Sequence, residues 1–141
     1  MYIVLIEDNS ELCGAIEELL TLCGYAVRGF LCAIDVFTSD IDPASIDAVV
    51  ADYYLPDGNG LDVVHHLRES QPDLPVIMIT TTTRDAVLQA IGTLRNCRLI
   101  PKPLDFERLL GELARIRMRK VGLRAIMDAC TPSPLSISAP T

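Results

Sequence analysis

The chain has 141 residues, enough for one domain with a substantial core, and half of them are hydrophobic. The formal net charge of −7 argues against direct nucleic-acid binding, and no apolar run reaches the roughly 20 residues that a membrane span needs. Five cysteines without a C-x-x-C pair, behind an N-terminus that lacks an export-signal pattern, predict a cytoplasmic protein with reduced thiols.

Strand and helix patterns alternate from the start of the chain. Residues 2–6 are apolar and predict a strand, and residues 10–23 repeat apolar side chains at helical spacing. Ser10 is the expected N-cap of that helix. Residues 25–31 predict a second strand and residues 33–39 a short helix.

The middle of the chain contains the most informative strand. Residues 48–51 are apolar and uncharged, and the run stops at Asp52, which is typical of a strand buried on both faces. Residues 56–60 are turn formers, so Asp52 is expected where a buried strand opens into a loop. A helix over residues 61–67 and an apolar strand over residues 75–80 follow.

The last elements are a weak helix pattern over residues 87–94, a brief strand over 98–100 and a clear amphipathic helix over 106–116. Five alternations of strand and helix predict an α/β fold, a doubly wound parallel sheet with helices on both faces. Pro101 has no N–H to donate, so the fifth strand is expected at an edge of the sheet.

We expect one domain over residues 1–120 and a C-terminal extension or linker over residues 121–141. Residues 121–129 have a short helical pattern. Residues 131–141 are rich in Pro, Ser and Thr, which favours disorder.

Four of the predicted strands end in side chains with useful chemistry, and right-handed crossovers would bring these ends to one edge of the sheet. They are Glu7 and Asp8, Asp52, Thr80, and Lys102. Each has an ordinary explanation by itself: an acidic helix start, a strand end or a surface charge. These ordinary explanations would all have to hold independently at matching strand ends. One shared site at this edge of the sheet is the simpler interpretation.

Three carboxylates at one edge repel one another, at a cost on the order of 1–4 kcal/mol for each pair about 4 Å apart. They require a cation, and Mg²⁺ is the hard, oxygen-binding ion that usually accompanies phosphate. Lys102 would meet a phosphate oxygen as a point charge, and the Thr80 hydroxyl could donate to another. Together these groups favour phosphoryl transfer onto Asp52, which gives an aspartyl phosphate.

A set of short motifs in this order closely resembles the receiver domain of two-component response regulators. The set consists of Glu7-Asp8, Asp52 with the following Leu-Pro-Asp-Gly-Asn-Gly loop, Thr80 and Lys102-Pro103. The resemblance covers residues 1–120 and implies a flavodoxin-like five-stranded sheet in the order 2-1-3-4-5.

The resemblance also implies the role of each residue. Asp52 would be the phosphoacceptor, and Thr80 and Lys102 would bind the phosphoryl group, with a cis bond after Lys102. Asp8 and Asp52 would ligate Mg²⁺ directly, together with the backbone carbonyl of Tyr54. Glu7 would act on the metal through water.

The resemblance implies partners as well. The phosphoryl donor would be a phosphohistidine on a histidine kinase or phosphotransfer protein, and the chain would catalyse only its own phosphorylation and dephosphorylation. The phosphoryl group would shift the surface of the fourth helix, fifth strand and fifth helix, which would control an effector domain or output protein or form a homodimer. No direct nucleic-acid or membrane contact is expected of this domain.

Two positions depart from the family pattern. Leu99 stands where the family has an aromatic switch residue, three before the lysine, which puts a threonine-to-aromatic relay in doubt. Tyr54, two beyond the acceptor, is large enough to gate the water that attacks an aspartyl phosphate. We therefore expect Tyr54 to alter the dephosphorylation rate.

Two interpretations from other classes stay open. A Mg²⁺-dependent phosphatase with an aspartyl nucleophile would resemble Asp-x-Asp, whereas Tyr54 occupies the third place here. A phosphorylation-independent interaction module could keep the same fold without using Asp52.

Overall fold

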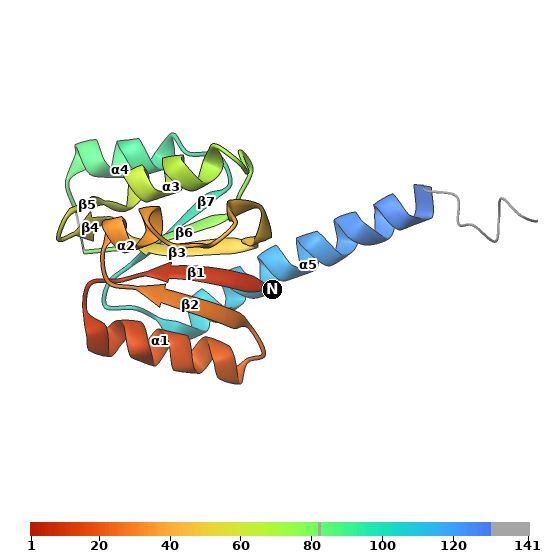
Figure 1. Ribbon diagram of the computed structural model, residues 1–141, viewed down its shortest axis with the longest axis horizontal. Helices are drawn as coiled ribbons and strands as arrows, with labels where there is room; N and C mark the ends of the chain where they lie inside the picture. Colours follow the sequence, from red (N-terminus) through yellow and green to blue (C-terminus); the bar gives the residue numbers. More distant parts are fainter. Residues whose placement is uncertain (82, 131–141) are drawn as a thin grey trace, which may run out of the picture.

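The computed structural model describes residues 1–81 and 83–130, and its centre is a five-stranded parallel sheet (Figure 1). The strand order is β2-β1-β3-β6-β7, with all four neighbouring pairs parallel. The strands are β1 (Tyr2–Ile6), β2 (Ala26–Phe30), β3 (Ala48–Asp52), β6 (Val76–Thr80) and β7 (Cys97–Pro101). This confirms the doubly wound fold, and the order is the expected 2-1-3-4-5 once the small hairpin described below is set aside.

Helices cover both faces of the sheet (Figure 1). They are α1 (Ser10–Leu22), α2 (Ala33–Phe37), α3 (Gly60–Arg68), α4 (Asp85–Gly92) and α5 (Phe106–Cys130), with a 3-10 turn η1 (Pro43–Ser45) before β3. One hydrophobic cluster joins the sheet to α2, α3 and α4, and a second joins it to α1 and α5. Each strand therefore has apolar side chains on both faces, as the central strands of a parallel sheet require.

The strand sequences produce these two layers by alternation. Val4 and Ile6 of β1 face the α2, α3 and α4 side, whereas Ile3 and Leu5 face α1 and α5. All five residues of β3 and of β6 are buried. β7 lies at an edge of the sheet, as predicted from Pro101.

The structure corrects two details of the sequence analysis and adds one element. The N-cap of α1 is Asn9, whose side chain accepts the Leu12 N–H at 3.1 Å, and Ser10 is the first helical residue. Residues 121–129 belong to the same continuous helix as Phe106, so they do not form a separate short helix. A two-stranded antiparallel hairpin, β4 (Tyr54–Leu55) with β5 (Gly58–Asn59), follows β3 and was not predicted. The disorder predicted for residues 131–141 lies outside the described residues.

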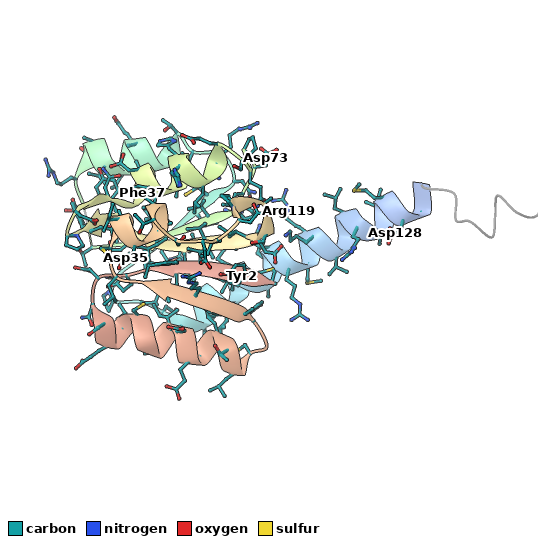
Figure 2. All side chains as sticks on the ribbon, viewed as in Figure 1. Tyr2, Asp35, Phe37, Asp73, Arg119 and Asp128 are labelled. Atoms are coloured by element: carbon teal, nitrogen blue, oxygen red, sulfur yellow. The ribbon has the colours of Figure 1, made fainter. Side chains whose placement is uncertain are left out.

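The C-terminal half of α5 projects beyond the sheet (Figure 1). We call residues 118–130 the distal α5; its labelled Asp128 stands clear of the sheet in Figure 2. Its large apolar side chains are exposed: Met118, Val121, Leu123, Ile126 and Met127. Lys120 nevertheless forms an ion pair with Asp47, just before β3. In the part of the chain that the structure describes, no helix has the length and apolar character to cross a membrane.

Candidate functional site

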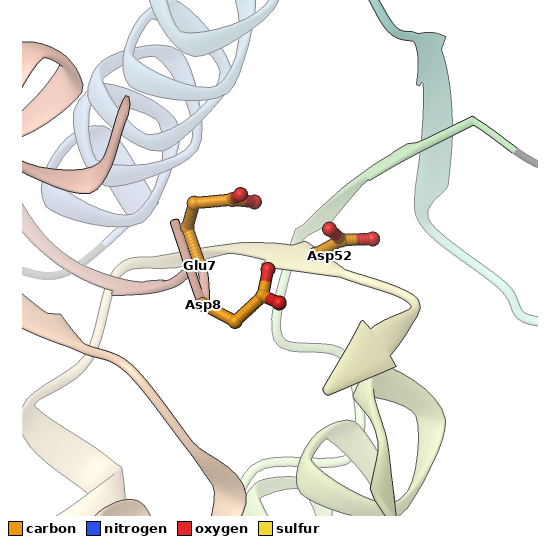
Figure 3. Close-up of side chains that lie close together, drawn as sticks. All are labelled: Glu7, Asp8 and Asp52. Atoms are coloured by element: carbon orange, nitrogen blue, oxygen red, sulfur yellow. The ribbon is translucent and has the colours of Figure 1, made fainter. Parts of the chain in front are cut away.

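Three carboxylates meet at the carboxyl edge of the sheet (Figure 3). Glu7 and Asp8 directly follow β1, and Asp52 is the last residue of β3. Because β1 and β3 are paired in parallel, with Ile6 opposite Ala51, their ends lie side by side. One oxygen from each carboxylate lies within 4.8 Å of the others, so the predicted convergence of these acids is confirmed as geometry.

Burial of these acids is unequal. Glu7 is fully buried and Asp52 is 5% exposed, whereas Asp8 is exposed to solvent. A buried carboxylate is costly unless it is paired and hydrogen-bonded. The site therefore requires positive charge close to Glu7 and Asp52.

Lys102 supplies that charge. Its Nζ donates to both carboxylate oxygens of Glu7, at 2.8 and 2.9 Å, and to Oδ2 of Asp52 at 2.8 Å. The lysine follows β7, two strands away from β3, and its N–H donates to the Thr80 carbonyl at 3.0 Å. The bond from Lys102 to Pro103 is cis, as expected. One ammonium group thus joins the ends of β1 and β3.

The pKa values of Glu7 and Lys102 are both raised, each for a different physical reason. Burial raises the pKa of Glu7, and the neighbouring Asp52 charge adds to this, while the hydrogen bonds and charge of Lys102 act against it. Burial alone would lower the pKa of Lys102, but its bonds to Asp52 and Glu7 outweigh that effect and raise it. The ammonium therefore stays protonated at neutral pH.

Thr80 lies at the same edge. It ends β6, the strand next to β3, and is 2% exposed. The register places Asp52 opposite Ile79, so Thr80 is one residue beyond the level of Asp52 in the sheet. The structure thus brings the predicted threonine to the edge where the carboxylates meet.

Tyr54 begins the hairpin that follows Asp52. Its backbone N–H donates to Oδ1 of Asp52 at 3.1 Å, and its side chain is 40% exposed. Its ring packs edge-on against Tyr53, with the centroids 4.9 Å apart. The backbone of Tyr54 is therefore bonded to the carboxylate that this residue was predicted to influence.

Sequence reasoning missed a close approach in this loop. A Cβ added to Gly60 would lie 2.3 Å from the backbone oxygen of Asp52 and 2.9 Å from Cε of Met78. The Gly60 N–H also donates to the Tyr53 carbonyl at 2.7 Å. The glycine was recognised only as a turn former, because a contact between residues eight apart leaves no periodic signal.

The donor set fits a hard divalent cation. Carboxylate oxygens are the ligands that Mg²⁺ prefers, and three of them converge here without a cysteine or histidine among them. One is solvent-exposed, which gives an ion a route into the cluster. The geometry can hold a cation and a phosphoryl group next to a buried carboxylate.

Comparison with known proteins supports the same interpretation. Residues 3–114 match the model of the response regulator receiver domain. The chain is 32% identical over 126 residues to the transcriptional regulatory protein TctD of Salmonella typhimurium, covering 86% of this chain and 54% of that protein. It is 30% identical over 147 residues to the response regulator MprA of Mycobacterium avium, covering 100% of this chain and 62% of that protein. The chain therefore spans little more than half the length of these relatives.

Solved structures have the same fold. The non-phosphorylated HemR receiver domain of Leptospira biflexa superposes with a TM-score of 0.74 at 29% identity, covering 82% of this chain and 92% of that one. A receiver domain protein from Clostridium thermocellum gives a TM-score of 0.72 at 25% identity, covering 86% and 98%. The BeF3-activated DrrB receiver domain gives 0.71 at 24% identity, covering 83% and 97%, and supports the fold alone.

Proposed function

Because the chain belongs to the receiver domain family of two-component response regulators, we propose that Asp52 accepts the phosphoryl group from a partner's phosphohistidine. The partner would be a histidine kinase or a phosphotransfer protein. The observation that carries this proposal is that Lys102 donates hydrogen bonds to both Glu7 and Asp52. These bonds hold its ammonium group against the proposed acceptor carboxylate.

In the proposed step, an Asp52 oxygen attacks the phosphorus in line with the bond to the imidazole nitrogen. The new O–P bond forms as the N–P bond breaks, and its electron pair returns to the imidazole. Lys102 and the Thr80 hydroxyl would each meet an oxygen of the transferring group, where negative charge is concentrated. The chain would act on its own carboxylate only, so it would not be an enzyme in the usual sense.

Asp8, Asp52 and the Tyr54 carbonyl would hold Mg²⁺ directly, and Glu7 would act through water. The ion would neutralise charge on the acceptor and on the phosphoryl oxygens. Support comes from the convergence of the three carboxylates within 4.8 Å. The exposed Asp8 can reorient towards an ion, whereas the buried Glu7 is already fixed by Lys102.

The proposed output is a shift of the surface formed by α4, β7 and α5, controlling an effector domain, an output protein or a homodimer. Moving such a surface from 1% to 99% active needs about 5.5 kcal/mol of differential stabilisation. Leu99 of β7 packs partly buried against the hydrophobic cluster of α2, α3 and α4. An aliphatic side chain there would transmit the change by repacking, without an aromatic rotamer switch.

Two further expectations belong to this proposal. Tyr54 would shield the aspartyl phosphate from water, so Tyr54→Ala should lose phosphate faster than the wild-type chain. Loss at the wild-type rate would refute the shielding role.

The described cysteines Cys13, Cys23, Cys32 and Cys97 are free thiols, in keeping with a reducing, cytoplasmic compartment.

Incubation with a small phosphodonor and Mg²⁺, followed by intact-mass measurement, tests the proposal. The wild-type chain and the control Asp128→Asn, on the distal α5, should gain one phosphoryl group, and Asp52→Asn should gain none. A gain that survives Asp52→Asn would move the acceptor elsewhere. No gain by the wild-type chain would favour a phosphorylation-independent interaction module.

A further inference from the structure

The tip of the β4–β5 hairpin is bound to a different part of the fold. Asp57 lies between the two short strands, and both oxygens of its carboxylate are used. Oδ1 accepts the N–H of Ala33 and Oδ2 the N–H of Ile34, each at 2.8 Å. These are the first two residues of α2, so a side chain 23 to 24 residues later in the chain holds the start of that helix.

α2 depends on this carboxylate for its cap. The first N–H groups of a helix have no partner within it and are usually met by the side chain of the N-cap residue. Here the N-cap residue is Cys32, whose side chain forms no capping hydrogen bond. The bonds from Ala33 and Ile34 lower the pKa of Asp57, so the carboxylate is charged at neutral pH.

The base of the same hairpin is fixed to the acceptor. Tyr54 donates its N–H to Asp52, and Gly60 closes the loop with a bond to Tyr53. Leu55, within the hairpin, is buried in the core. The loop therefore has its base on the acceptor strand and its tip on α2.

The segment that is hydrogen-bonded to Asp57 is also hydrogen-bonded to the backbone of Glu7, in the acidic cluster. The Glu7 N–H donates to the Phe30 carbonyl at 3.0 Å, and Phe30 ends β2, three residues before α2 begins. Residues 30–34 are thus bonded to the backbone beside Glu7 on one side and to Asp57 on the other. The spacing between the end of β1 and the loop after β3 is braced through this segment.

We propose that Asp57 is a positioning residue for divalent-cation binding. By tying the hairpin to α2, it fixes the backbone at Tyr54 relative to Asp52 and to the acids after β1. It touches neither the cation nor the phosphoryl group. The inference rests on the proposed function, because it concerns how well the same site is organised for Mg²⁺.

The test compares two aspartates that each cap a helical turn. Asp57→Asn keeps the shape but places an amide N–H₂ against a backbone N–H. Asp42→Asn is the control, since Asp42 caps η1 by accepting the Ala44 N–H at 3.0 Å and lies before β3, at the opposite edge of the sheet. Mg²⁺ itself is titrated calorimetrically into the unphosphorylated chain, and urea unfolding is measured on each variant.

Asp57→Asn should bind Mg²⁺ about tenfold more weakly, as is found when residues that support metal ligands are changed. Asp42→Asn should bind with wild-type affinity even if both variants lose similar stability. Unchanged affinity in Asp57→Asn, or an equal loss in both variants, would overturn the inference. Failure of the wild-type chain to bind Mg²⁺ would instead count against the proposed function.

A measurement on the wild-type chain decides the question if Asp57→Asn does not fold. Thermodynamic coupling is reciprocal. If the hydrogen bonds from Ala33 and Ile34 to Asp57 favour Mg²⁺ binding, then bound Mg²⁺ must stabilise those hydrogen bonds. Adding Mg²⁺ should slow hydrogen exchange at the Ala33 and Ile34 amides, with the Ala44 amide as the internal control. Exchange at Ala33 and Ile34 that ignores Mg²⁺ would overturn the inference.

Discussion

The acidic edge of the sheet and the distal α5 differ in which kind of side chain is buried and which is exposed. At the edge, the carboxylates of Glu7 and Asp52 are buried and accept hydrogen bonds from Lys102, whereas on the distal α5 large apolar groups face solvent. The match to the receiver domain family ends at residue 114, before the distal α5 begins. The contrast separates residues whose packing maintains the domain from a helical segment whose large apolar side chains lie in solvent.

The contrast can be tested with one substitution made twice on the same helix. Leu113 is fully buried against the sheet, whereas Leu123 is 60% exposed. Leu113→Ala should lower the free energy of unfolding by about 3–5 kcal/mol, because it removes buried area and leaves a cavity. Leu123→Ala should change it by no more than about 0.5 kcal/mol.

Urea or guanidinium unfolding of both variants measures the difference. Equal and large losses would contradict the comparison, since they would mean that the distal α5 is packed in solution. Repeating the measurement at several protein concentrations would then show whether a second chain provides the packing.

The two lysines of the chain offer a second matched pair, one in each region. Lys102 is 16% exposed and neutralises the buried Glu7, whereas Lys120 is 45% exposed in its pair with Asp47. Lys102→Met should cost about 3 kcal/mol of stability, because a buried carboxylate loses its partner. Lys120→Met should cost less than about 1 kcal/mol, since solvent screens the exposed pair.

Thermal and urea unfolding at neutral pH would measure both lysine variants. A small loss for Lys102→Met would mean that Glu7 is already protonated at that pH. The same variant should also fail to retain phosphate, which would separate the chemical role of Lys102 from its structural one.

The sequence predicted the acidic edge because each of its members follows an apolar run. Runs of four or more apolar residues define the ends of β1, β3 and β6, and parallel strands place these ends together. The hydrogen bonds between Asp57 and α2 could not be predicted, since they join a hairpin with strands of two residues each to a helix of five residues. Neither element is long enough to produce a period.

The other differences have equally local causes. Asn9 and Ser10 are both good N-cap residues, and adjacent candidates cannot be separated without the backbone angles. The continuity of α5 was obscured because apolar residues in its distal part lie on several faces, with Gly122 among them. The pattern there resembles no single buried face.

Two glycines test the same contrast through the backbone. A Cβ at Gly60 would collide with the Asp52 carbonyl, whereas one at Gly122 on the distal α5 would meet nothing within 4 Å. Gly60→Ala should lower the free energy of unfolding by about 2 kcal/mol, through the displacement of a packed loop. Gly122→Ala should raise the helicity of the distal α5 by removing a penalty of up to about 1 kcal/mol.

Circular dichroism and urea unfolding would report the two glycine effects. Gly60→Ala should also weaken Mg²⁺ binding, because the loop it displaces carries Tyr54. A Gly60→Ala variant with unchanged stability would show that the loop moves away freely.

The smallest expected effect concerns the pH dependence of stability: the contributions of Glu7 and Asp47 should change in opposite directions as the pH falls. The pKa of Glu7 is raised by burial, so the folded state binds more protons than the unfolded state above the unfolded value of about 4.3. Its contribution therefore improves stability as the pH falls through that window. Burial opposes ionisation of Asp47 too, but its bonds to Lys120 and to the Tyr2 N–H lower its pKa.

The contribution of Asp47 is therefore present above the unfolded value of about 3.9 and is lost as the pH falls through its lower folded value. Because solvent reaches the pair with Lys120, the loss should stay below about 1 kcal/mol. In urea unfolding from pH 7 to pH 3, Asp47→Asn should lose less stability on acidification than the wild-type chain, and Glu7→Gln should gain less. Parallel curves for the two variants would mean that the acidic edge and the Lys120–Asp47 ion pair of the distal α5 respond to protons alike, against the contrast drawn between them.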